Sequence, residues 1–192
     1  MKHSTFPNNQ GLPQTLFLYG TYREDGTPNF GLFCWFSYQW NNNQLGVMVD
    51  IGDDKLTKDR ILKTGEFSAN LVTESILSIS DYLGTIPGTD PEKMKIPFEF
   101  ENGQKLNVPI FSASPVSYEL KVSKHIPMNG SDVFLCDIVN TLQDECIIQA
   151  KSPQERHEVI KQIGPVCTTF TSYYSFDGRY LGEWHELAKN IK

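Results

Sequence analysis

Two strand-like segments on either side of one Asp-Gly dipeptide constrain the fold more than any other feature of this sequence. Residues 15–22 and 29–38 are rich in aromatic and β-branched side chains, which favour extended backbone. Between them, Asp25-Gly26 supplies the positive φ that a tight hairpin turn requires. We therefore expect an antiparallel hairpin that follows a loose arm over residues 1–11.

The rest of the chain continues as hairpins with helices inserted between them. Further strands are expected over residues 45–51, 67–72, 116–125, 133–142 and 166–174. Turns are expected at Asn41-Asn42-Asn43 and at Asn129-Gly130. A tail over residues 176–192 follows the last strand.

Three helices are expected from their capping and stop signals. The first runs over residues 58–64, with Thr57 as its N-cap and Gly65 as its stop. The second runs over residues 74–83, where apolar residues recur on one stripe. The third follows the capping box of residues 152–155, which has proline at the first helical position.

This order of elements indicates the fold class. Hairpins come first, and strands and helices do not alternate as in a doubly wound sheet. The expected fold is mainly β, an antiparallel barrel with peripheral helices, in a single domain over residues 1–192. Residues 85–97 contain several prolines and glycines, so we expect a loop there, of the kind that often borders a functional site.

Composition excludes several classes of function. The net charge is −6 and no Lys/Arg cluster occurs, which argues against a nucleic-acid partner. No apolar run approaches the roughly 20 residues of a membrane helix. The first ten residues lack the apolar stretch of a signal peptide, so we expect a cytoplasmic protein. The four cysteines lack CxxC spacing and are expected to be mostly buried, reduced packing residues.

The familiar catalytic motifs are absent from the sequence. It contains no GxGxxG, P-loop or GxSxG pattern, and its four histidines have no metal-ligand spacing. We therefore predict no metal site, and no catalytic side chain can be assigned from a motif.

Two local features remain as candidates for a binding site. Lys55-Leu56-Thr57 opens the first helix, where free N–H groups, a lysine and a hydroxyl are suited to a phosphate monoester. The same pattern also describes a capped helix beside a solvated lysine, and Asp53, Asp54 and Asp59 favour that alternative.

The second feature is the aromatic segment over residues 29–36. Its apolar side chains and its backbone polar groups could line a flat redox-active ring, and Gly31 would let the ring approach the backbone. By pattern alone, a core strand with aromatic residues on both faces is the commoner interpretation.

Several ordered motifs resemble the flavin reductase-like family of flavoredoxin type. They are FLYGTY at 17–22, DGTPN at 25–29, CWF at 34–36, KLT at 55–57, GEFSANL at 65–71, NVP at 107–109 and SPVSYEL at 114–120. Each motif is weak alone, and their order and spacing over residues 14–175 carry the resemblance.

The resemblance implies a fold, a cofactor and a set of site residues. The fold would be an FMN-binding split barrel of Greek-key antiparallel strands, working as a homodimer. The flavin ring would contact the segment Asn29, Phe30, Gly31, Leu32, Phe33 and Cys34. Lys55 and Thr57 would bind the FMN phosphate, Asn70 would hold that corner, and Trp184 would approach from the partner subunit.

Three functions follow as hypotheses. The first is an FMN-dependent oxidoreductase that passes electrons from NAD(P)H, or from a reduced redox partner protein, through FMN to an acceptor. The second is a non-catalytic FMN-binding module or sensor. The third is a partner-interaction protein that has lost the cofactor. Cofactor content and turnover with NAD(P)H distinguish the three.

Overall fold

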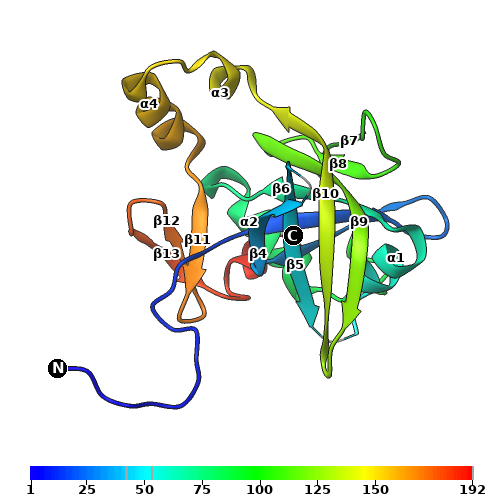
Figure 1. Cartoon of the computed structure of the whole chain (residues 1–192), viewed down its shortest axis with the longest axis horizontal. Helices are drawn as coiled ribbons and strands as arrows, with labels where there is room; N and C mark the ends of the chain where they lie inside the picture. The colour runs from blue at the N-terminus through cyan, green and yellow to red at the C-terminus, as the bar shows by residue number, and fades with distance from the viewer. Residues whose placement is uncertain (42, 53, 192) are drawn as a thin grey trace.

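A seven-stranded antiparallel sheet forms the body of the computed structural model, which describes residues 1–41, 43–52 and 54–191 (Figure 1). The strand order is β3-β2-β6-β9-β10-β5-β4. In chain order the strands are β2 (Phe17–Tyr22), β3 (Pro28–Phe33), β4 (Phe36–Asn41), β5 (Gln44–Gly52), β6 (Glu66–Leu71), β9 (Val116–Pro127) and β10 (Ser131–Gln143). The predicted Asp-Gly hairpin is confirmed, with Thr21 opposite Asn29 in the β2–β3 pair.

The predicted strand over residues 29–38 is two strands. β3 and β4 are separated by Cys34 and Trp35, and they occupy opposite edges of the sheet. Because only two residues join the edges, the sheet must curl until they meet, as in an open barrel. The ring of Phe17 on β2 stacks on that of Phe36 on β4 at 4.2 Å. The break contains no Gly or Pro, so no residue pattern indicated it.

A second, four-stranded sheet lies beside the barrel, with the order β1-β11-β12-β13 (Figure 1). Its strands are β1 (Gln14–Thr15), β11 (Val166–Thr169), β12 (Ser172–Ser175) and β13 (Tyr180–Glu183). The expected last strand over residues 166–174 is therefore a hairpin, which turns at Phe170 and Thr171 with φ values of 54° and 64°. A third pair joins β7 (Phe100–Asn102) to β8 (Pro109–Phe111).

The helices lie outside the barrel. They are α1 (Leu56–Thr64), α2 (Leu77–Thr85) after the 3₁₀ turn η1 (Glu74–Ile76), α3 (Glu145–Gln149) and α4 (Pro153–Ile163), and a second 3₁₀ turn η2 (Leu187–Asn190) follows β13. The capping box of α4 is confirmed, since Glu155 N–H donates to Ser152 Oγ at 3.1 Å. The N-cap of α1 is Lys55, so the expectation that Thr57 is the N-cap is wrong.

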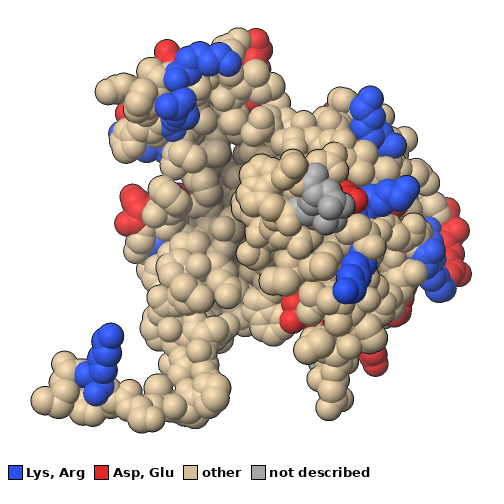
Figure 2. All heavy atoms as spheres, in the orientation of Figure 1, with Lys and Arg blue, Asp and Glu red and all other residues tan. Residues whose placement is uncertain are grey.

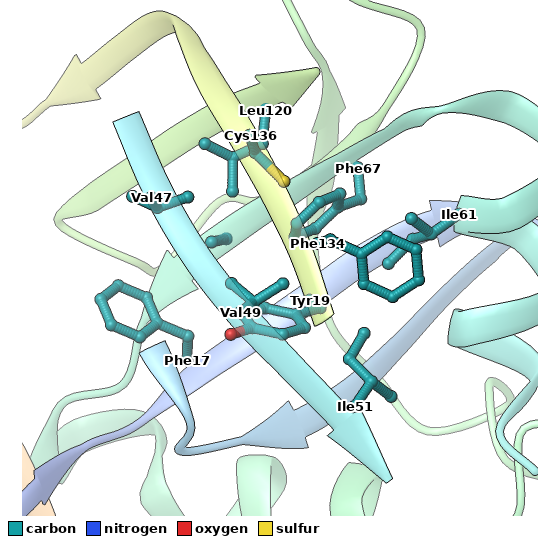
Figure 3. Close-up of a cluster of buried hydrophobic side chains, with 11 residues drawn as sticks. Phe17, Tyr19, Val47, Val49, Ile51, Ile61, Phe67, Leu120, Phe134 and Cys136 are labelled. Carbon is teal, nitrogen blue, oxygen red and sulfur yellow. The ribbon is translucent and has the colours of Figure 1, made fainter. Parts of the chain in front are cut away.

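Two hydrophobic clusters meet across β2. Because successive side chains of a strand point to opposite faces, Phe17 and Tyr19 enter the barrel cluster shown in Figure 3, while Leu16 and Leu18 enter a second cluster beneath α2. The segment over residues 176–192 is only partly a tail, because Leu181, Trp184 and Leu187 pack against the second cluster. α2 and η2 are thereby brought into contact.

Surface and cysteine features complete the description. On the face seen in Figure 2, basic and acidic side chains are interspersed. All four cysteines are free, and only Cys136 is fully buried, so the expectation that most are buried is wrong. Asn42 of the predicted turn, Asp53 near the predicted helix start and Lys192 lie outside the described residues.

Candidate functional site

Strand β3, the start of α1 and the segment after α2 together border one groove. Two adjoining cavities of about 250 and 190 Å³ share Leu32, Phe33, Lys55 and Gly84 as lining residues. The groove therefore combines three segments that are distant in sequence. It includes the loop over residues 85–97 that the sequence marked as the edge of a site, although α2 extends into that loop as far as Thr85.

One end of the groove is polar and cationic. Lys55, Thr57 and Lys93 line the larger cavity together with the carboxylate of Asp54. The Thr57 hydroxyl oxygen accepts a hydrogen bond from Asn29 Nδ2 at 3.0 Å, which leaves its own proton free to donate. The start of α1 lies here too, and a helix N-terminus favours anions. This end is suited to a phosphate group.

Lys93 has the most strongly perturbed charge at this end, and it was not among the residues predicted from the sequence. Its side chain is only 3 % exposed, and no salt-bridge partner lies within reach among the described residues. Burial, and then the charges of Arg23 and Lys55, lower its pKa from 10.5 to about 7. Lys93 is a buried amine close to two other cations, and a bound anion would stabilise its charged form. No local motif distinguishes Lys93 in the sequence. Its only sequence signal is its position in the long loop over residues 85–97, which was expected to border a site.

Asn29 is buried behind the same end of the groove. Its side-chain oxygen Oδ1 is buried and has no hydrogen-bond partner among the described residues. Buried polar atoms are nearly always paired, so an unpaired one calls for an explanation. Gly88 lies so close that a Cβ there would stand 3.1 Å from this oxygen. Asn29 lines neither cavity, and it supports the groove from behind through its hydrogen bond to Thr57.

Two glycines in the middle of the groove allow its walls to pack closely. A Cβ at Gly31 would stand 2.9 Å from the ring of Phe33 and 3.2 Å from Thr57 Oγ1. A Cβ at Gly84 would stand 2.7 Å from the Cβ of Leu32. Side chains at these positions would therefore collide with the groove walls, and the expectation that Gly31 lets a flat ring approach the backbone stays a prediction.

The other end of the groove has more apolar side chains in its lining, although Lys55 and Asp81 line it too. Leu32, Phe33 and Cys34 form one side of the smaller cavity, and Trp184 and His185 also line it. Burial raises the pKa of the Cys34 thiol, so the thiol stays protonated at neutral pH. Trp184 comes from the same chain, where its indole N–H donates to Thr168 Oγ1 at 2.7 Å. Trp184 therefore lines the groove of its own chain, and its approach to a partner subunit's site stays a prediction.

Besides Asn29, two more of the nominated residues, Phe30 and Asn70, line neither cavity. Phe30 is fully buried and makes edge-to-face contacts with Phe98 and Phe111. Asn70 is also fully buried, and all its hydrogen-bonding groups are used within the protein. Its Nδ2 donates to Leu18 O and Ser68 Oγ, and its Oδ1 accepts from Phe111 N–H and Ser117 Oγ. Both side chains stabilise the fold, and neither lines a wall of the groove.

The curled antiparallel sheet and the groove beside it define the class of the protein as a small β-barrel with a binding groove that is cationic at one end. A family model described as the flavin reductase like domain matches residues 10–155. Because the match covers most of the chain, the protein belongs to the flavin reductase-like family. No curated protein matches the sequence significantly.

Solved structures of the same fold agree with this assignment. Flavoredoxin from Methanosarcina acetivorans has a TM-score of 0.78 at 22 % identity, covering 99 % of both chains. Flavoredoxin of Desulfovibrio vulgaris (Miyazaki F) has a TM-score of 0.77 at 23 % identity, covering 97 % of this chain and 98 % of that one. An FMN-binding protein from Thermus thermophilus has a TM-score of 0.71 at 19 % identity, covering 91 % and 93 %.

The family match supports a flavin cofactor and a flavin-related oxidoreductase activity. The groove fits such a group, because Lys55, Thr57 and the buried Lys93 border its cationic end and Leu32 and Phe33 line both of its cavities. Within the described residues, no helix is long and apolar enough to cross a membrane. No cluster of metal-ligating side chains occurs among them either.

Proposed function

We propose that this protein is a cytoplasmic FMN-dependent oxidoreductase that accepts electrons from NAD(P)H, or from a reduced redox protein, and passes them to an acceptor. The observation that carries the proposal is the polarity of the groove. Thr57 and Lys93 line only its cationic end, and Lys55, Leu32 and Phe33 lie where the two ends adjoin. A flavin mononucleotide has the same polarity, with a phosphate at one end and a flat ring at the other.

The chain's residues have distinct roles in this proposal. Lys55 and Lys93 hold the phosphate by charge, and the Thr57 hydroxyl donates to it. Leu32 and Phe33 exclude water from the ring, and the protonated Cys34 thiol leaves the wall uncharged. When bound, the flavin supplies the electron-transfer chemistry. The protein supplies position, a dry wall and electrostatic tuning, so an acid–base side chain is not required.

We also propose that the protein is a homodimer. Support comes from α4, which buries none of its residues although Val159, Ile160 and Ile163 form an apolar stripe. An 11-residue helix is marginal in water unless its apolar face is packed. A hollow beside this part of the chain is visible in Figure 2. Sedimentation analysis should give a dimer, and Ile160→Glu should shift it toward monomer; a wild-type monomer would refute this part of the proposal.

The visible absorption spectrum of the purified protein tests the main proposal. Flavin bands that bleach when NADH or NADPH is added without oxygen are the expected result. Bands that persist would favour a protein electron donor or a non-catalytic flavin module. A colourless protein that also fails to take up added FMN would refute the proposal.

A further inference from the structure

A buried carboxylate on α2 holds the C-terminal segment in place. Asp81 is 1 % exposed. Its Oδ1 accepts hydrogen bonds from the Tyr173 hydroxyl at 2.6 Å and from the His185 backbone N–H at 2.9 Å. Its Oδ2 accepts from the Ala188 backbone N–H at 2.8 Å. A buried charge is stable only when such donors surround it, and two of these three belong to the segment over residues 184–190.

Other contacts hold this segment in the same position. The Trp184 backbone N–H donates to Thr171 O at 2.9 Å, in addition to its indole bond. The Thr85 hydroxyl and His185 Nδ1 lie 2.8 Å apart. His185 has a φ of 65°, a left-handed conformation that is uncommon for a residue with a side chain. Such a conformation persists where surrounding contacts impose it.

The held segment borders the apolar end of the groove. Trp184 and His185 line the smaller cavity, with Asp81 and Tyr173 beside them, and Leu32 and Cys34 of the barrel also contribute to its lining. The cavity therefore has one side built by the barrel and one side built by the end of the chain. The position of the second side depends on the hydrogen bonds to Asp81.

We propose that residues 184–190 are a strap that forms the outer wall of the ring-binding end of the flavin groove, and that Asp81 is the positioning residue that holds this strap. The inference rests on the proposed function, because it takes the occupant of the groove to be a flavin. Asp81 acts through Trp184 and His185. Loss of its charge frees the strap, admits water at the ring end and weakens every flavin equally, whether or not the flavin carries a phosphate.

The first measurement needs no flavin. In Asp81→Asn the size is kept, but only one terminal atom can still accept, so either the His185 N–H or the Ala188 N–H faces an NH₂ group and loses its acceptor. Hydrogen exchange of the amides over residues 184–190 should accelerate about tenfold or more, the factor expected for a lost hydrogen bond to a charged group. The matched control is Asp177→Asn, because Asp177 accepts from Arg179 N–H in the exposed β12–β13 turn, away from the groove. Exchange in the control should match the wild type.

The second measurement compares two flavins. In Asp81→Asn, the dissociation constants of FMN and of riboflavin should both rise by about tenfold, and their ratio should stay unchanged. Ala188→Pro removes one donor to the carboxylate without altering Asp81, and it should move both constants in the same direction. If Asp81→Asn does not fold, the dissociation constants of Ala188→Pro test the strap instead.

Each contrary result overturns a defined part of the inference. Unchanged exchange in a folded Asp81→Asn would show that the carboxylate does not hold the strap. Faster exchange with unchanged affinity for both flavins would show that the strap is not a wall of the site, and a loss confined to FMN would refute its place at the ring end. Wild-type protein that binds neither flavin would overturn the proposed function and the wall with it, while the exchange data would still decide the role of Asp81.

Discussion

Replacing Lys93 with glutamine should separate the binding of FMN from the binding of riboflavin. The two flavins share the ring and the ribityl chain and differ by the phosphate. Lys93 is buried at the cationic end of the groove beside Lys55, with Arg23 close enough to lower its pKa. Glutamine keeps much of the length of the side chain and removes the charge. The change should therefore affect only the ligand that carries a phosphate.

The expected magnitude follows from the kind of bond that is lost. A hydrogen bond between charged groups contributes roughly 1.5–3 kcal/mol, which corresponds to a roughly 10- to 150-fold change in the dissociation constant. We expect Lys93→Gln to weaken FMN within that range and to leave riboflavin unchanged. Lys95→Gln is the matched control, because Lys95 is two residues away, exposed and paired with Glu92 at 2.5 Å.

The pH dependence provides an independent test of the same residue. Without ligand, the pKa of Lys93 is about 7, so the amine is neutral above that pH. A bound phosphate favours the ammonium form and raises this pKa, so FMN binding takes up a proton between pH 7 and the raised value. FMN affinity should then fall by up to about tenfold per pH unit above pH 7. The Lys93→Gln variant should lose this slope.

Titrations that follow the quenching of flavin fluorescence at several pH values measure all of these quantities. Equal losses for FMN and riboflavin in Lys93→Gln would show that Lys93 supports the groove as a whole and does not bind the phosphate. An unchanged FMN affinity, or a pH slope that survives the substitution, would refute the electrostatic argument.

Four further outcomes follow from the structure. Lys55→Glu combined with Thr57→Ala should weaken FMN at least tenfold in titrations of the folded double variant, and unchanged affinity would place the phosphate elsewhere. Gly31→Ala should lower the affinity for both flavins, because its Cβ would stand 2.9 Å from the ring of Phe33. Asn70→Ala should lower the free energy of unfolding in urea by ~2–4 kcal/mol, because it leaves the buried Phe111 N–H and Ser117 hydroxyl unpaired, with flavin affinity retained. Between pH 7 and 10.5 the unfolded chain binds a proton at Lys93 that the flavin-free native state does not, so stability should rise with pH by at most ~1.4 kcal/mol per unit, and Lys93→Gln should flatten this rise.

The sequence by itself determined the local elements and the family. Asp25-Gly26 specifies its hairpin because a tight turn needs a positive φ, and Ser152 with Glu155 specifies the start of α4 because the two side chains satisfy free N–H groups. Ordered motifs over residues 14–175 gave the flavin reductase-like resemblance that the family match confirms. Such signals are readable because each depends on residues only a few positions apart.

The tertiary structure decided how distant residues combine. Nothing near Lys93 in the sequence distinguishes it from Lys95, and only burial between other cations gives it a lowered pKa. The sequence does not distinguish Asn70 from Asn29, since each is an asparagine in a strand. In the structure Asn70 is fully hydrogen-bonded within the protein, whereas Asn29 keeps an unpaired oxygen behind the groove. Trp184 reaches the groove within its own chain because Asp81, far away in sequence, accepts from the residues that follow it. Burial, desolvation and hydrogen bonding between segments arise only when the chain folds, so the sequence pattern could not reveal them.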